Sequence, residues 1–193
     1  MFHWWTQPDS NRRLSYLNSV KSRGLLVWLY DFICIFISGL KRYILTAIDL
    51  NSSFAFAYTY TNTNLSSRSS TDFFHKLDKV SPVSIGRIQT DNGAEFHKLF
   101  REELEKKNIT HFFAYPRRPQ QNAKVERFNR TLQEEFINHH LQLLAYAIDE
   151  FNRKLMDYLL WYNTERPHYA LSLQTPINYI INHYQSNMLR TYA

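Results

Sequence analysis

An apolar run at residues 25–40, LLVWLYDFICIFISGL, sets the first limit on what this chain can fold into. Its 16 residues fall short of the roughly 20 that a helix needs to span a bilayer. Asp31 lies near the middle, where a carboxylate costs about 2.5 to 3.5 kcal/mol on membrane-insertion scales. No small-residue cleavage site follows, as a signal peptide would require. We therefore expect a strand buried on both faces of a sheet, and no membrane partner.

Length and composition narrow the class further. A chain of 193 residues can form one ordinary domain with end segments. The 23 Lys and Arg residues exceed the 17 Asp and Glu residues, which is consistent with a polyanionic partner. Cys34 is the only cysteine, so an intramolecular disulfide and a cysteine-rich zinc site are excluded. This cysteine usage fits a reducing cytosol, and we expect a cytoplasmic protein.

Three β-rich segments follow an N-terminal stretch that has no sustained period. Residues 1–24 are interpreted as an unstructured or atypical extension. Short links separate the β-rich segments 25–37, 41–50 and 53–60, which predicts an antiparallel meander. A hairpin that turns at Ser38-Gly39 in simple register places Asp31 opposite residue 47 and Asp49 opposite residue 29. Both carboxylates would then point to one face of the sheet.

Strands and helices alternate in the rest of the chain. The patterns predict strands at 84–90 and 109–115 and helices near 95–107, 123–136 and 141–162, with a last short helix from Pro176. A further helix would carry Phe73, Phe74 and Leu77, and serines of the polar loop 61–70 could cap it. Val125, Phe128, Leu132 and Phe136 would form the buried face of the helix at 123–136. Three strands followed by this alternation predict a mixed sheet covered by helices.

The segment IQTDNGAEF, residues 88–96, is either a hairpin turn or an acid held at the end of a strand. Asn-Gly is a strong hairpin signal, but a helical pattern follows it and no second strand does. Asp91 is therefore placed at the carboxyl end of a strand, where open α/β sheets bind ligands. An aspartate that only satisfies its own turn remains the alternative.

A basic segment contains a single carboxylate, Glu126. The five cations around it are Arg117, Arg118, Lys124, Arg127 and Arg130. A carboxylate at a helix start can converge with one at a strand end. Clustered carboxylates repel unless they hold cations, and oxygen ligands favour Mg²⁺ or Mn²⁺. Two such ions, about 3.5 to 4 Å apart, can activate a nucleophile and stabilise the leaving oxygen in phosphoryl displacement.

This chemistry calls for a third carboxylate, and two aspartates upstream qualify. Asp31 lies within an apolar strand, where an acid is costly unless it is paired or bound to a metal. Asp49 begins DLNSS, a sequence that offers local hydrogen bonds of the turn type. The pattern favours Asp31 as the third carboxylate, but Asp49 remains an alternative.

Four stretches together resemble the catalytic core of insertion-sequence transposases related to retroviral integrases: KRYILTAIDLNSSFAFAYTY, QTDNGAEF, QQNAKVERFNRTLQEEF and YNTERPHYALSLQTPINY. The likeness covers roughly residues 25–182. It implies a ribonuclease-H-like α/β fold with a mixed five-stranded sheet flanked by helices. The core would span residues 25–138, and residues 139–193 would form a C-terminal helical extension.

The resemblance also implies an Asp, Asp, Glu triad that binds two Mg²⁺ or Mn²⁺ ions. The first aspartate of the family lies about ten residues before the KRYILTAID strand, which matches Asp31 and not Asp49. The second aspartate matches Asp91, and the glutamate matches Glu126. The implied enzyme cleaves DNA and transfers DNA strands during transposition or integration, without a small-molecule cofactor.

The implied partners are DNA, both element ends and target, and further copies of the chain, at least as a dimer on DNA. The protein would be cytoplasmic and associated with the nucleoid. Asn122 and Arg130 lie one helical turn on either side of Glu126, so both are expected to reach a DNA end. The other cations of the segment would contact DNA phosphates. A salt bridge from Arg130 to Glu126 is the structural alternative.

Arg166 and His168, in TERPHYAL, belong to the family signature, and we expect a structural role for them. The family normally carries a helix-turn-helix region before the core, and residues 1–24 lack its length and helical pattern. The alternative function is therefore a truncated, inactive core that binds DNA or co-assembles with a full-length relative as a regulator.

Overall fold

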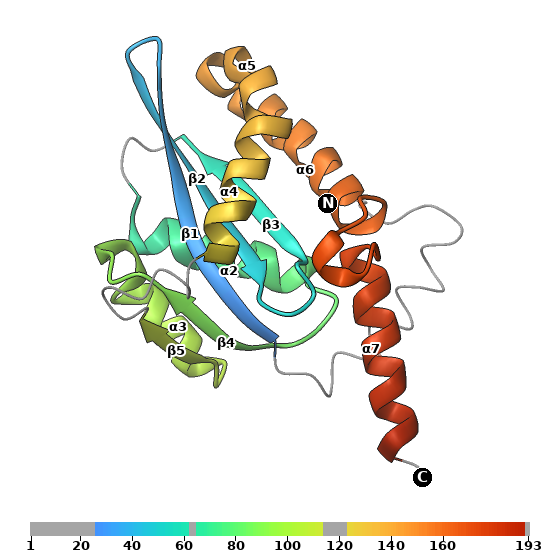
Figure 1. Ribbon diagram of the computed structural model, residues 1–193. Coiled ribbons are helices and arrows are strands. Elements are labelled where there is room, and N and C mark those ends of the chain that lie inside the picture. The colour runs from blue at the N-terminus through green and yellow to red at the C-terminus, as the bar shows by residue number, and fades with distance from the viewer. Residues whose placement is uncertain (1–25, 62–64, 114–122, 192–193) are drawn as a thin grey trace.

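The structure is a computed structural model that describes residues 26–61, 65–113 and 123–191. Five strands form one mixed sheet in the order β3-β2-β1-β4-β5 (Figure 1). Neighbouring strands are antiparallel from β1 to β3, whereas β4 runs parallel to β1 and β5 runs parallel to β4. The strands are β1 (Leu26–Ile37), β2 (Leu40–Asp49), β3 (Ala55–Tyr60), β4 (Ile85–Thr90) and β5 (Thr110–Phe113). The predicted meander and mixed sheet are confirmed.

Helices cover both faces of this sheet. Tyr30 of β1 packs against Phe73 and Phe100, whereas the next residue, Asp31, bonds to Asn129. Because successive strand residues point to opposite faces, α2 and α3 lie on one face and α4 on the other. Figure 1 shows α4 crossing β1 and β2. The helices are α2 (Ser67–Val80), α3 (Leu99–Lys106), α4 (Ala123–Glu135), α5 (Leu141–Tyr146), α6 (Ile148–Thr164) and α7 (Pro176–Thr191), with short turns η1 (Ala94–Phe96), η3 (Ile137–His139) and η4 (Tyr169–Leu171).

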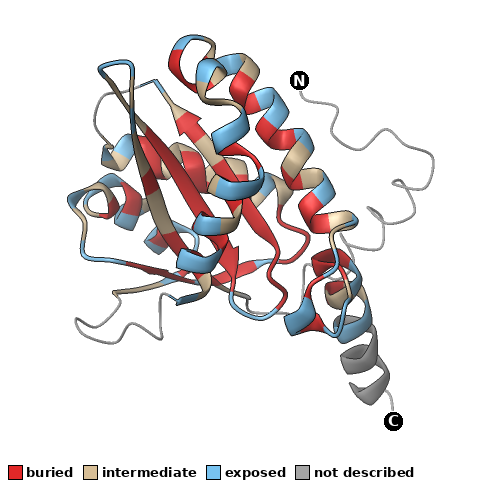
Figure 2. Ribbon diagram, turned by 45° about the horizontal axis from the view of Figure 1, so that its top comes forward, coloured by how far each residue is buried: buried red, intermediate tan, exposed pale blue. Residues whose placement is uncertain are grey.

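The apolar run at residues 25–40 forms most of β1 and the turn that follows it. Trp28, Leu29 and Tyr30 are buried, and buried residues concentrate on the central strands and the inner faces of the helices (Figure 2). The predicted apolar face of α4 is buried as well: Val125, Phe128, Leu132 and Phe136. Across residues 26–61, 65–113 and 123–191, no helix has the length and apolarity needed to cross a membrane.

The register of the β1–β2 hairpin differs from the predicted one by one residue. Asp31 pairs with Thr46 and Asp49 pairs with Trp28. Ser38 and Gly39 both take positive φ and fill a two-residue turn, so residue 37 pairs with residue 40. The predicted register needed a three-residue loop and was wrong. A one-residue slip reverses the side-chain alternation, so Asp31 and Asp49 point to opposite faces.

Two predicted helices are broken in the structure. The helix expected at 141–162 divides at Ala147, because Arg42 donates to the carbonyls of Leu144 (3.1 Å) and Ala145 (2.7 Å). A continuous helix would use those carbonyls for its own hydrogen bonds. The helix expected at 95–107 begins only at Leu99, after Lys98 adopts a φ of +48°.

The outer edge of β3 is covered by α6. Asn152 exchanges two hydrogen bonds with the backbone of Thr59, at 3.0 and 2.9 Å. Asn163 does the same with Ala55, at 2.9 and 2.8 Å. An open sheet edge exposes backbone groups that invite pairing with another strand. The two asparagines satisfy these groups at both ends of β3 and fix α6 against the sheet.

Candidate active site

Strand pairing brings the first two predicted carboxylates together. Leu29 of β1 pairs with Gln89 of β4 in parallel register. Asp31 lies two residues after Leu29 in β1, and Asp91 lies two residues after Gln89, just past the end of β4. β4 ends at Thr90, so Asp91 lies at the carboxyl end of the strand, as the sequence predicted. Its Oδ1 accepts the N–H of Gly93 at 3.1 Å, a turn-type bond that also matches the structural alternative.

Helix α4 supplies the third carboxylate from above the sheet. Asn129 Nδ2 donates to Asp31 Oδ2 at 2.8 Å, which fixes α4 over the middle of β1. Glu126 precedes Asn129 by three residues and therefore lies on the same side of the helix. Glu126 and Asp91 are exposed, whereas Asp31 is half-buried. The charges of Asp91 and Glu126 both act on Asp31, so the three carboxylates lie in the same region of the fold.

The pKa of Asp31 is affected by both of the other carboxylates. The pKa of Asp31 is raised to about 6, chiefly by burial, while the hydrogen bond from the N–H of Phe32 acts in the opposite direction. The charges of Asp91 and Glu126 contribute to the rise, and the bond from Asn129 counteracts it. Like charges that act on one carboxyl indicate that Asp91 and Glu126 lie near enough to Asp31 to repel its ionised form.

The donor set suits a hard divalent cation. Asp31, Asp91 and Glu126 offer only carboxylate oxygens, which Mg²⁺ and Mn²⁺ prefer. A cation beside Asp31 would favour its ionised form and offset the effects of burial and of its two neighbours. Within the part of the chain that the structure describes, no three Asp, Glu, His or Cys side chains are spaced as a ready metal site.

Comparison with known proteins places this arrangement in a family. A family model described as integrase core domain matches residues 22–119, and a second model with the same description matches residues 107–176. The chain belongs to the integrase core domain family. This confirms the resemblance inferred from the four sequence stretches.

Relatives of this integrase core include ORF3 of Spiroplasma virus SpV1-C74, provisionally named an integrase. The two chains are 36% identical over 111 residues, which is 51% of this chain. The match spans only 30% of the length of the viral protein.

Solved structures share the fold. The HTLV-2 integrase catalytic core domain, solved with magnesium in a dimeric form, has a TM-score of 0.62 at 20% identity and covers 82% of this chain and 99% of its own. A chain of the simian T-cell lymphotropic virus intasome, solved in complex with PP2A regulatory subunit B56 gamma, has a TM-score of 0.64 at 19% identity. That match covers 82% of this integrase core and 56% of the intasome chain. The predicted fold class is confirmed.

Asp49 is engaged by its own loop. Its Oδ2 accepts the N–H groups of Asn51 (3.1 Å) and Ser52 (2.6 Å) and the hydroxyl of Ser52 (2.8 Å). Lys124 of α4 donates to the carbonyl of Leu50 at 2.5 Å, and its charge lowers the pKa of Asp49, although burial raises this pKa overall. Lys124 therefore joins the start of α4 to the turn between β2 and β3.

The predicted DNA-contacting residues fall into three groups, of which the first is Lys124, which is half-buried and donates to the carbonyl of Leu50. Arg127 and Arg130 are exposed on α4, next to Glu126. Among the residues that the structure describes, no salt bridge joins Arg130 to Glu126. Arg117, Arg118 and Asn122 lie outside the described residues.

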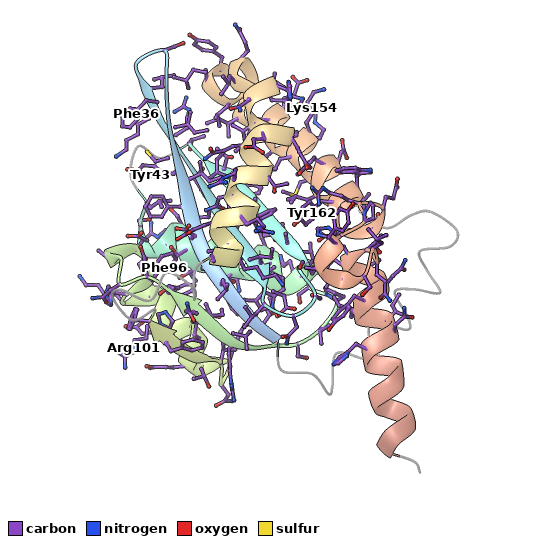
Figure 3. The ribbon with its side chains drawn as sticks, viewed as in Figure 1. Phe36, Tyr43, Phe96, Arg101, Lys154 and Tyr162 are labelled. Atoms are coloured by element: carbon purple, nitrogen blue, oxygen red, sulfur yellow. The ribbon has the colours of Figure 1, made fainter. Side chains whose placement is uncertain are left out.

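Arg166 and His168, which follow α6, contact the helices around the site. Arg166 donates to both carboxylate oxygens of Glu135, at 2.6 and 3.1 Å, and so ties the end of α6 to the end of α4. The ring of His168 packs edge-on against Tyr162, with 4.8 Å between ring centroids. Tyr162 reaches from α6 toward α4 and packs against Phe128 (Figure 3). These contacts hold the helix that carries Glu126.

Three residues around the site were missed by the sequence reasoning: Asn129, Thr90 and His111. Asn129 had a signal, since it lies one helical turn after Glu126 in a helix whose apolar face was predicted. Thr90 precedes Asp91 and hydrogen-bonds to its carbonyl, and His111 contacts the Thr90 hydroxyl from β5. Their partners depend on strand pairing, which the sequence pattern does not report.

Proposed function

We propose that this chain is the catalytic core of a metal-dependent enzyme that cleaves DNA and transfers DNA strands in transposition or integration. The observation that supports the proposal is that the charges of Asp91 and Glu126, from two separate elements, act on the half-buried carboxyl of Asp31. Membership of the integrase core domain family supports it. Two magnesium-containing structures of HTLV-2 integrase, described as dimeric and trimeric, support a metal and a homo-oligomer.

Asp31, Asp91 and Glu126 would together hold two Mg²⁺ or Mn²⁺ ions. Bound there, the ions would activate the attacking oxygen and stabilise the leaving oxygen of a phosphodiester. Water is the nucleophile of strand cleavage and a DNA 3′-hydroxyl that of strand transfer, and neither step passes through a covalent enzyme intermediate.

The remaining work of the protein is positioning and charge neutralisation. Asn129 holds one oxygen of Asp31 and so orients its carboxylate. Arg127 and Arg130 are exposed beside Glu126 and would contact the phosphates of the element end or the target. Contacts of Lys124 and Arg166 with neighbouring elements hold α4, and with it Glu126, against the sheet.

The experiment that tests this function is strand joining by the full chain. The substrate is a DNA duplex with a nicked end, and the enzyme is assayed with Mg²⁺ and with chelator. Glu126→Gln keeps the shape of the side chain and removes its charge. Glu134→Gln changes an exposed glutamate of the same helix and serves as the matched control.

Wild type and Glu134→Gln should join DNA only with metal, and Glu126→Gln should lose about 100-fold or more, the usual scale for removing a group that stabilises a transition state. Undiminished, metal-dependent joining by Glu126→Gln would refute the assignment. Salt-sensitive DNA binding and self-association without any joining by wild type would favour the regulatory alternative.

A further inference from the structure

Asp91 lies just outside the regular pairing of the sheet. It follows the last residue of β4 and is exposed, and within the described part of the chain its carboxylate accepts a bond from the N–H of Gly93. A carboxylate that must meet two others in a small space needs a fixed backbone. The anchor comes from the opposite face of the sheet.

Thr90 provides that anchor. Its side chain points away from that of Asp91, and only 1% of the residue is exposed. The Thr90 hydroxyl donates to the carbonyl oxygen of Asp91 at 2.7 Å and lies 3.0 Å from Nε2 of His111. A hydroxyl carries one hydrogen, and a carbonyl can only accept. The second bond therefore runs from His111 Nε2–H to the hydroxyl oxygen, which fixes the tautomer of the imidazole.

His111 is itself held rigidly. It lies on β5, opposite Ile88 of β4, and its ring packs against Phe113 (4.7 Å between centroids) and edge-on against Phe100 (5.5 Å). Burial and the nearby charge of Arg101 lower the pKa of His111 to about 4, so the ring is neutral at pH 7. A neutral ring with its hydrogen on Nε2 is the form that the hydrogen-bond chain requires.

We propose that Thr90 and His111 are positioning residues that fix the main chain of Asp91 and thereby place its carboxylate toward Asp31 and Glu126. The chain of bonds runs from β5 through β4 to the site. Its contribution to catalysis rests on the proposed function, because the carboxylates must bind metal for the placement to matter. The hydrogen-bond chain itself can be tested in the protein without metal.

The test compares two pairs of variants in the full chain. Thr90→Val removes the hydroxyl with little change of shape, and Thr90→Ser keeps it. His111→Phe keeps a ring but removes the donor, and His111→Gln restores an N–H. Mg²⁺ and Mn²⁺ affinities are measured by calorimetry, joining of nicked-end DNA by gel assay, and the tautomer of His111 by nitrogen NMR without metal.

Thr90→Val and His111→Phe should weaken metal binding and joining by about 10- to 100-fold, the usual effect of removing a group that orients a ligand. Thr90→Ser should stay close to wild type, and His111→Gln should recover part of the loss. NMR should find the hydrogen on Nε2 in wild type. If Thr90→Val does not fold, the inference is tested by the ratio of metal affinity and of joining activity between His111→Gln and His111→Phe, which should exceed one.

Two results would overturn the inference. One is an Nδ1–H tautomer in the wild-type protein, which would mean that the hydrogen-bond chain does not exist. The other is metal affinity and joining that are unchanged in the folded variants lacking the hydroxyl or the donor. Failure of the wild-type protein to bind metal or join DNA, with the Nε2–H tautomer present, would count against the proposed function alone.

Discussion

Replacing Asp31 with asparagine should make the metal-free protein more stable. The pKa of Asp31 rises from 3.8 in a model peptide to about 6 in the fold, mainly because of burial. A difference of about two units corresponds to roughly 3 kcal/mol at 1.36 kcal/mol per unit. Because Asp31 is only half-buried and solvent screens part of the effect, about 1 to 3 kcal/mol is the expected gain at pH 7.5. The asparagine keeps an oxygen to accept the bond from Asn129.

The gain should depend on pH in a defined direction. The folded pKa of Asp31 is raised, so the protonated acid adds stability at pH values below 3.8, and this contribution is lost as pH rises through about 6. As pH falls, the free energy of unfolding of wild type therefore rises relative to that of Asp31→Asn. The stability difference between the two proteins should shrink by up to about 2 kcal/mol between pH 7.5 and pH 4.5.

Urea unfolding in the presence of chelator measures both effects. Asp157→Asn, at an exposed position of α6, is the control and should change stability by less than about 0.5 kcal/mol at either pH. The reasoning is refuted if Asp31→Asn is no more stable than wild type at pH 7.5. It is also refuted if the gain is the same at both pH values.

Two further changes test the supports of the site. Asn152→Leu leaves the N–H and the carbonyl of Thr59 without their partner at the covered sheet edge. The free energy of unfolding, measured in urea, should therefore fall by about 2 to 4 kcal/mol. A fall below about 0.5 kcal/mol would show that water replaces the side chain. Arg127→Ala should lower the slope of log DNA affinity against log salt concentration by about one phosphate contact. Lys124→Ala should leave this slope nearly unchanged, because Lys124 already contacts Leu50. Equal slopes for the two variants would contradict this expectation.

Local patterns predicted the buried faces and the order of the elements. Periodicity identified the apolar face of α4, and β-rich segments separated by short links identified the meander. The strand-turn-helix context placed Asp91 at the end of β4. Each of these features depends on residues that are close together in the sequence, and a sequence pattern can therefore predict it.

Features that depend on distant partners were not predictable in the same way. Arg42 breaks a helix 102 residues away, and Asn129 bonds to Asp31 across 98 residues. The hairpin register depends on φ at Ser38, where a positive value is unusual for a residue other than glycine. The choice of Asp31 over Asp49 came from the family resemblance, and the loop bonds that engage Asp49 are consistent with it.

The most direct test of the central account is the pKa of the Asp31 carboxyl, measured by carbon NMR with and without Mg²⁺. Without metal it should lie near 6. Saturating Mg²⁺ should lower it by at least about one unit, because a cation at the three carboxylates favours the ionised form. Glu126→Gln should reduce that response. A pKa near 6 that Mg²⁺ does not move would contradict the account, since the three carboxylates would then not form a divalent-metal site.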